Sequence, residues 1–278
     1  SLSLLSGAPL RVWGFSDPRT IQLIGEATAA SFRDRNAYFG DPDNLRADLS
    51  QLLEPEYLSE RRRQMSSTSR SNVHLGNTSE TSESTETTHF SVIDQWGGAV
   101  SCTTTLNSNF GAKVMAAGIL FNNEMDDFAA QPGKANQFGL VQSSANAIVP
   151  GNRPLSSMAP TIVLQDGKVD AVIGSPGGPT ILSTVLQVIL NRYVFDMNPT
   201  QAVAAPRFHR QDLPIYIKYE WNRIDMASRN RLRQFNQPLE KVSGLGLVNA
   251  IFNYNGEWHA IADRRGDGWA HSMLENEL

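Results

Sequence analysis

The residues of this chain that could carry chemistry begin with a threonine at a junction. Thr87 follows a long polar run, residues 66–86, and precedes a β-prone segment, residues 88–94. If the peptide bond between Glu86 and Thr87 were cut, the Thr87 hydroxyl would lie beside its own free α-amine. Such an amine is a recognised general base for a weak hydroxyl nucleophile. A Ser/Thr-rich stretch before a strand is more often only a loop, so this interpretation depends on the rest of the chain.

Residues further along could complete such a site. Glu124 and Asp127 lie in a dense polar cluster directly after an apolar run, and the ends of strands are common places for sites. Gly177 and Gly178 precede an expected helix, where backbone N–H groups suit an oxyanion or a carboxylate. Each feature has a plainer alternative, because the acidic cluster could form a turn and a glycine pair before a helix is only modest support.

Composition and charge narrow the class of protein. The chain has 278 residues with 40% hydrophobic and 19% charged side chains, which is typical of a globular protein with a sizeable core. A net charge of −4 gives no electrostatic reason to expect nucleic acid as a partner. Cys102 is the single cysteine, so no intrachain disulfide can form. No apolar run reaches the roughly 18 residues that predict a membrane span.

Several familiar signals are missing from the sequence. It has no Cys/His metal spacing, phosphate loop or dinucleotide fingerprint, so we expect no metal or cofactor. The first residues lack an initiator methionine and a basic leader, and we therefore expect the chain to begin within a longer one.

The elements that must position the candidate residues are short. Asp17-Pro18 predicts a helix start, because Asp accepts from free N–H groups and Pro suits the first helical position. From residue 88 onward the pattern changes to short β runs separated by turns. The other expected elements are hairpins at 88–94 with 99–106 and at 160–164 with 169–174, an apolar run at 115–121, helices at 54–64, 179–193, 199–205 and 226–235, and strands at 215–220, 238–241, 248–254 and 258–262.

Three further features carry alternatives. The loop expected at residues 131–150 is long enough to suggest a functional lid. The arginines at 61–63 predict a solvated helix face, with an anion site as the minor alternative. His89 is interpreted as a structural hydrogen-bonding residue, and His209 could be either structural or functional.

With these pieces in order, the chain resembles the γ-glutamyltranspeptidase family of N-terminal-nucleophile hydrolases. The resemblance covers roughly residues 17–267, and its order and spacing fit the family. The motifs that carry it are ETTHFSV at 86–92, TLN at 105–107, GILFNNEMDDF at 118–128, RPLSSMAPT at 153–161 and GSPGG at 174–178, with PRFH at 206–209 and DRNAYFGDP at 34–42 in support.

The resemblance implies a fold and a division of the chain. The fold would be α+β, a four-layer αββα sandwich of the N-terminal-nucleophile type, here partial because most of the large-subunit portion is absent. Residues 1–86 would be the C-terminal part of the large subunit, ending in a flexible linker at about 66–86. Residues 87–278 would be the catalytic small subunit, released by autocatalytic cleavage between Glu86 and Thr87.

The resemblance also implies a role for each matching residue. Thr87 would attack the γ-carbonyl of a γ-glutamyl compound such as glutathione, and Thr105 would orient it. The N–H groups of Gly177 and Gly178 would form the oxyanion hole. Water or an acceptor amino acid or peptide would then take the glutamyl group. The implied substrate contacts are Asn107, Glu124 and Asp127 for the α-amino group and Ser156 and Ser157 for the α-carboxylate.

Some of these roles have a plainer alternative, and the chain departs from the family at two points. Thr105 alone would be an ordinary strand threonine, and Ser156-Ser157 could cap a turn. Phe138 occupies the lid position where many members have tyrosine, and it cannot donate a hydrogen bond to Asn107. No segment matches the motif of the large-subunit arginine that binds the substrate carboxylate, so we expect the remaining large-subunit segment as a partner.

Two other functions stay open. A related acylase, acting on cephalosporin side chains or poly-γ-glutamate, is disfavoured because Asn107, Glu124 and Asp127 are all present. A non-catalytic fragment or inactive relative is the second alternative. Members of the family are often periplasmic or extracellular.

Overall fold

The computed structural model describes residues 1–45, 48–67, 87–221 and 223–272, and the chain forms two compact units. The first unit comprises residues 1–82, 123–156 and 208–243, and the second comprises residues 83–122, 157–207 and 244–278. Residues 68–86, most of the expected linker, lie outside the described residues.

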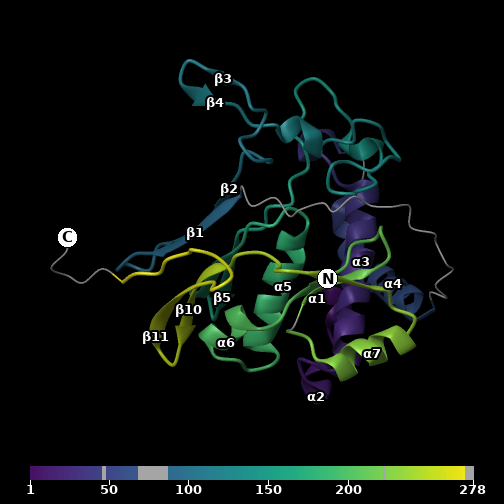
Figure 1. Ribbon diagram of the computed structural model, residues 1–278, viewed down its shortest axis with the longest axis vertical. Helices are drawn as coiled ribbons and strands as arrows, with labels where there is room; N and C mark the ends of the chain where they lie inside the picture. Colours follow the sequence, from purple (N-terminus) through teal and green to yellow (C-terminus); the bar gives the residue numbers. More distant parts are fainter. Residues whose placement is uncertain (46–47, 68–86, 222, 273–278) are drawn as a thin grey trace. The chain divides into compact units, whose positions relative to one another are not determined.

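The first unit is organised around helix α3, Pro18–Tyr38, the long purple helix in Figure 1. The Asp17 carboxylate accepts the Arg19 N–H at 2.8 Å and Pro18 occupies the first turn, which confirms the predicted start. Nearly every side chain from Ile24 to Ala30 is buried. The other helices of this unit are α1 (Leu2–Leu5), α2 (Leu10–Trp13), α4 (Pro55–Ser67) and α7 (Met226–Gln234), with 3₁₀ turns η1 (Pro42–Asn44), η2 (Leu49–Leu53), η3 (Glu124–Asp127) and η4 (Ser144–Asn146).

A small sheet packs on α3. It contains β7 (Phe208–His209), β8 (Ile217–Glu220) and β9 (Leu239–Val242); β7 and β8 are antiparallel, and β8 and β9 are parallel. Gly25 of α3 lets Ile217 approach closely, since a Cβ at Gly25 would lie 3.3 Å from the Ile217 Cδ1.

The second unit is built on an antiparallel sheet of four strands in the order β11-β10-β6-β5. A separate ribbon is formed by β1 (Thr88–Ile93) and β2 (Ala99–Thr104). The sheet strands are β5 (Thr161–Gln165), β6 (Lys168–Gly174), β10 (Asn249–Tyr254) and β11 (Glu257–Ala262), and a short hairpin joins β3 (Met115–Ala116) to β4 (Ile119–Leu120).

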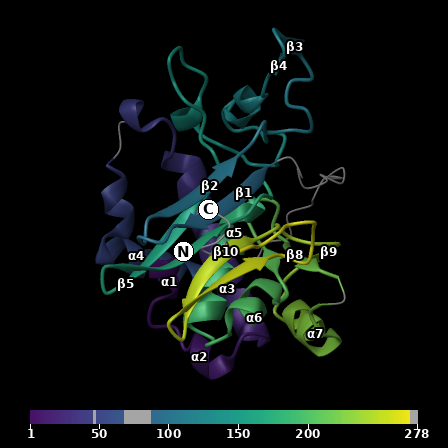
Figure 2. The same cartoon turned by 90° about the vertical axis from the view of Figure 1, so that its left-hand side faces the viewer.

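The helices α5 (Thr180–Tyr193) and α6 (Pro199–Ala204) contact this sheet, and the ribbon contacts it as well. Ile173 of β6 belongs to the apolar core with Ile181 and Val185 of α5. On the ribbon side, Ser91 Oγ donates to the carbonyl oxygen of Asn249 at 3.2 Å, and Ser101 Oγ donates to that of Ile173 at 3.0 Å. Figure 2 shows the ribbon laid over the strand layer, so this unit has helix, sheet and ribbon layers.

The predicted helices and strands are confirmed to within a few residues, and the α+β class with them. Three features differ. The run 115–121 is not one strand, because Ala117 and Gly118 have φ of 50° and 77° and turn the chain. Arg61 is ion-paired with Asp34 instead of lying on a solvated face. The loop 131–150 contains η4 and a buried leucine, Leu140.

Among the described residues, no helix has both the length and the apolar composition that crossing a membrane requires.

Candidate active site

The register of the ribbon brings Thr87 beside Thr105. Thr88 pairs with Thr104, so the next residues outward on the two antiparallel strands also face each other. Thr87 is 7% exposed, and its Oγ1 donates to Thr105 Oγ1 over 3.0 Å. Thr105 Oγ1 also accepts the Asn107 N–H at 2.9 Å. This chain of hydrogen bonds holds the Thr87 hydroxyl in one orientation.

A glycine turn joins β6 to α5 in the same unit. Gly177 and Gly178 have φ of 133° and 54°, and the Gly177 carbonyl accepts from both the N–H (3.1 Å) and the hydroxyl (2.8 Å) of Thr180. A Cβ at Gly177 would lie 2.6 Å from Thr180 Oγ1. Both the backbone conformation and the close approach therefore require glycine at this position.

His89 fixes the start of β1 against the end of β6. Its ring lies over Gly174, where a Cβ would be 2.2 Å from the nearest ring atoms, and its carbonyl accepts from Asn249 Nδ2 at 2.9 Å. Because Gly174 comes three residues before Gly177, Thr87 and the glycine turn lie at the same end of the second unit. The contact of His89 with Gly174 therefore places residues 87–89 beside the end of β6 that leads into the glycine turn.

His89 and His209 are both buried, and each makes hydrogen bonds inside the protein. His89 shares hydrogen bonds with Thr103 Oγ1 (2.8 Å) and Ser91 Oγ (3.0 Å), which confirms the structural interpretation. His209 contacts Gln211 Oε1 at 3.1 Å and the Phe32 ring edge-on. Burial lowers the pKa of each to about 4, so both are neutral at physiological pH.

The candidate amine-binding carboxylates lie together on η3 of the first unit. Burial, together with the charge and hydrogen bond of Asp127, raises the pKa of Glu124 to about 7. Glu124 is therefore partly protonated near neutral pH, whereas an unperturbed glutamate would be fully ionised. Over the residues described here, no group of three or more His, Cys, Asp or Glu side chains could hold a metal ion.

The remaining predicted residues lie on loops. Ser156 is exposed and Ser157 is half-buried. Phe138 lies in a turn capped by Asn136, whose Oδ1 accepts the Phe138 N–H at 3.0 Å. The structure places Thr87, Thr105, Asn107, Ser157, Gly177 and Gly178 in the second unit, and Glu124, Asp127, Phe138 and Ser156 in the first.

An ion pair behind the glycine turn was not found from sequence. Arg207 is 1% exposed, contacts Asp263 at 2.6 Å and donates to the Leu245 carbonyl at 2.7 Å. The adjacent Gly246 packs on the turn, since a Cβ at Gly177 would lie 3.5 Å from the Gly246 Cα. The PRFH motif pointed to Arg207, but nothing local to it indicates a partner more than fifty residues away in sequence.

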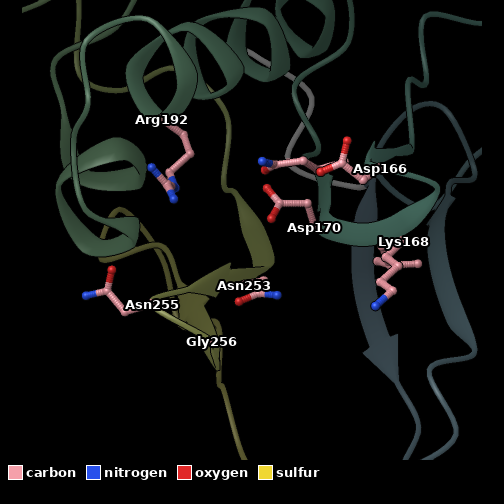
Figure 3. Close-up of a pocket in the computed structure, with 9 residues that line it drawn as sticks. Asp166, Lys168, Asp170, Arg192, Asn253, Asn255 and Gly256 are labelled. Carbon is pink, nitrogen blue, oxygen red and sulfur yellow. The ribbon is translucent and has the colours of Figure 1, made fainter.

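A pocket of about 420 Å³ lies at the other end of β6 and contains none of the predicted site residues. Figure 3 shows Arg192 and Asp170 on either side of it, and the Tyr193 hydroxyl donates to Asp170 Oδ2 at 2.5 Å. A seven-residue strand spans about 20 Å, so β6 separates this pocket from the glycine turn.

Comparison with known proteins gives consistent matches. The sequence profile described as Gamma-glutamyltranspeptidase matches residues 1–273. A glutathione hydrolase proenzyme from Pseudomonas aeruginosa is 47% identical over 258 residues, which are 90% of this chain and 45% of that protein. The chain therefore spans less than half the length of this relative.

Solved structures agree on the fold. A γ-glutamyltranspeptidase mutant from Helicobacter pylori matches with a TM-score of 0.62 and 44% identity, covering 64% of this chain and 100% of that chain. A cephalosporin acylase from Bacillus halodurans matches with a TM-score of 0.77 over 98% of this chain and 48% of that one, and at 21% identity it shows likeness of fold alone.

Proposed function

Because this chain belongs to the γ-glutamyltranspeptidase family, we propose that it carries the nucleophile of an enzyme that cleaves γ-glutamyl amides such as glutathione. Residues 1–86 are the C-terminal part of the large subunit, and residues 87–278 are the catalytic small subunit. The relative from Pseudomonas aeruginosa is a proenzyme, which supports a precursor that is processed. The remaining large-subunit segment is the partner that completes the substrate site.

The observation that carries the proposal concerns Thr87, the residue directly before β1. Its side chain is buried, and its hydroxyl donates a hydrogen bond to Thr105 Oγ1. Cleavage between Glu86 and Thr87 would expose an α-amine on the same residue. The amine and hydroxyl of one threonine are separated by only two carbon atoms, so the base is positioned without help from another side chain.

The reaction follows from these groups. The α-amine of Thr87 takes the hydroxyl proton while Oγ1 attacks the γ-carbonyl carbon of the donor. The carbonyl oxygen becomes an oxyanion, which the N–H groups of Gly177 and Gly178 stabilise. The intermediate collapses, the C–N bond breaks, and the protonated α-amine returns its proton to the leaving amine. Water or an acceptor amine then attacks the resulting ester in the same way, releasing glutamate or a new γ-glutamyl amide.

Charge complementarity supports the roles of the binding residues. A substrate α-ammonium suits Asp127 and Glu124, because a nearby cation favours the ionised form of the pair and lowers the raised pKa of Glu124. The amide of Asn107 adds a neutral acceptor for the same group. The hydroxyls of Ser156 and Ser157 donate to the α-carboxylate.

The lid residue bears on the choice between water and an acceptor. Phe138 offers a ring without a hydroxyl, so it has no side-chain donor for a hydrogen bond to Asn107. We therefore propose that hydrolysis is favoured over transfer. A Phe138→Tyr variant should raise the ratio of transfer to hydrolysis, and an unchanged ratio would contradict this part of the proposal.

The first experiment is intact mass measurement with N-terminal sequencing of the full-length protein. Wild type should yield a fragment beginning Thr87-Thr88-His89 and should release aniline from a γ-glutamyl anilide. Thr87→Ala should stay whole and inactive, whereas Thr88→Ala, the neighbouring exposed threonine, should be cleaved normally. An uncut wild type that still turns over the anilide would overturn the assignment of Thr87.

A further inference from the structure

The backbone that carries the serine pair is held by a residue far earlier in the chain. Arg35 lies in the last turn of α3 and is 8% exposed. Its Nη2 donates to the carbonyl oxygens of Leu155 at 3.3 Å and Ser156 at 3.2 Å. One guanidinium nitrogen thus bridges two successive carbonyl groups directly before Ser157.

The side chain of Asn146 holds the same backbone by accepting a hydrogen bond from the Leu155 N–H. The Oδ1 of Asn146 accepts the Leu155 N–H at 3.1 Å, and its Nδ2 donates to the Asp127 carbonyl at 2.8 Å. Asn146 is 2% exposed, so these hydrogen bonds lie out of water, where leaving either group unbonded is costly. Leu155 is therefore fastened at both its N–H and its carbonyl, and Asn146 links it to the carboxylate turn η3.

Arg35 also lies within the electrostatic reach of that turn. The Asp127 carboxylate raises the pKa of Arg35, while burial lowers it more strongly, to about 10. Arg35 is therefore still a cation at neutral pH. A buried cation is costly unless it is well partnered, and here its partners are the backbone of the serine pair and the carboxylate pair.

The end of α3 fastens the neighbouring loop as well. The Ser143 N–H donates to the Asn36 carbonyl at 2.9 Å, and Ser143 Oγ donates to the Ala37 carbonyl at 2.8 Å. A Cβ at Gly40 would lie 1.9 Å from the Ala145 carbonyl oxygen, so only glycine allows this approach. The loop from 143 to 156 is thus built directly against residues 35–40.

We propose that Arg35 and Asn146 are positioning residues for the end of the γ-glutamyl substrate that carries the α-carboxylate. This inference rests on the proposed function, because it takes Ser156 and Ser157 as the hydroxyls that bind that carboxylate. Arg35 precedes the cut and the serines follow it. After cleavage, the upstream polypeptide therefore sets the geometry of a subsite on the downstream one.

The field of Arg35 acts with opposite signs on the two ends of the substrate. A cation near the subsite favours a bound carboxylate and opposes a bound ammonium. Loss of Arg35 should therefore weaken ligands through their carboxylate and leave ammonium binding unchanged or tighter. A residue that merely stabilises the fold would weaken both.

The test compares two competitive inhibitors of γ-glutamyl anilide hydrolysis by the full-length protein. Glutarate keeps the carboxylate and lacks the amine, and 4-aminobutyrate keeps the amine and lacks the α-carboxylate. In Arg35→Met the Ki of glutarate should rise by about 10-fold or more, while that of 4-aminobutyrate should not rise. Arg33→Met is the matched control, because Arg33 lies on the same helix with its side chain 44% exposed and pairs with Asp212.

Conservative variants keep the inference testable if Arg35→Met does not fold. Arg35→Lys, which keeps the charge but not the forked donor, should give a smaller rise for glutarate alone. Asn146→Leu, which removes the acceptor for the Leu155 N–H without adding a charge, should raise the Ki of glutarate more than that of 4-aminobutyrate. Thermal unfolding and fragment masses establish that each variant is folded and cut.

The outcomes are distinguishable. If both inhibitors weaken equally, or neither changes in a folded Arg35 variant, Arg35 is structural only and the inference is wrong. If the wild type releases no aniline, the proposed function is overturned and the inference with it.

Discussion

Replacing Thr105 by valine tests the hydrogen-bond chain that orients the nucleophile. Valine has nearly the shape of threonine, so the change removes the hydroxyl and little else. Thr105 Oγ1 accepts from Thr87 Oγ1 at 3.0 Å and from the Asn107 N–H at 2.9 Å, and both partners are buried. Two neutral hydrogen bonds at about 1 kcal/mol each amount to about 2 kcal/mol.

We expect this free energy to be lost from transition-state stabilisation. Without the Thr105 hydroxyl, the Thr87 hydroxyl loses its fixed orientation and the Asn107 backbone loses one hydrogen bond. At about 1.4 kcal/mol per factor of ten, kcat/KM should fall by about 30-fold. The assay is γ-glutamyl anilide hydrolysis, normalised to the cleaved fraction determined by mass. Cleavage itself should also slow, because the same hydroxyl performs it.

Two control variants isolate the hydroxyl. Thr105→Ser keeps Oγ and should stay within about threefold of wild type, since only a methyl group is lost. Thr104→Val removes an exposed hydroxyl one residue earlier and should have no effect. If Thr105→Val matches Thr105→Ser in kcat/KM, the hydrogen-bond chain does not orient the nucleophile and the reasoning is refuted.

Three further predictions follow from the structure. KM for γ-glutamyl substrates should fall as pH rises through about 7, because Glu124 becomes an anion there, and Glu124→Gln should abolish this dependence. The pKa of Glu124 is raised in the folded state, so the stability of the wild type should fall as pH rises from about 4.5 to 7. The stability of Glu124→Gln should not fall in this way. Gly177 has a φ of 133°, and a Cβ there would lie 2.6 Å from Thr180 Oγ1, so Gly177→Ala should lower activity by about 100-fold or more. Gly167→Ala is the control, because Gly167 also has a positive φ but lies in open space, and this variant should keep its activity. Arg207→Met should lower the free energy of unfolding, measured in urea, by about 3 kcal/mol, because it leaves the buried Asp263 carboxylate with Arg265 as its single remaining ion-pair partner. Arg19→Met, at an exposed ion pair, is the control. An equal loss of stability in both variants would contradict the role of the buried pair.

The local elements of this chain could be predicted because their signals are local. Asp17-Pro18 caps α3, and Asn198-Pro199 starts α6 with Asn198 and Gln201 forming a capping box. The run 115–121 forms two short strands, and apolar composition does not distinguish one strand from two when a turn lies between them. Composition also could not separate Arg61, which is paired with Asp34, from the exposed Arg63.

The sequence indicates some residues of the candidate site and not others. Thr87 and the glycine pair stand out by residue type and by their place beside a strand or helix. Arg35 does not, since an arginine in the last turn of a helix is usually a surface residue that suits the helix dipole. Its partners Leu155 and Ser156 come 120 and 121 residues later, and only the folded chain brings them together.

The contacts between residues 35–41 and the loop from 143 to 156 also bear on whether the chain folds before or after it is cut. Arg153, for example, pairs with Asp41 across the predicted cut at 2.7 Å. If the chain is cut after it folds, this contact surface forms while its two sides still belong to one molecule. Two polypeptides made separately would instead have to meet by diffusion and lose about 4–15 kcal/mol of translational and rotational freedom. The lifetime of the cut protein would then depend on how slowly its pieces separate, and not on how readily they find each other.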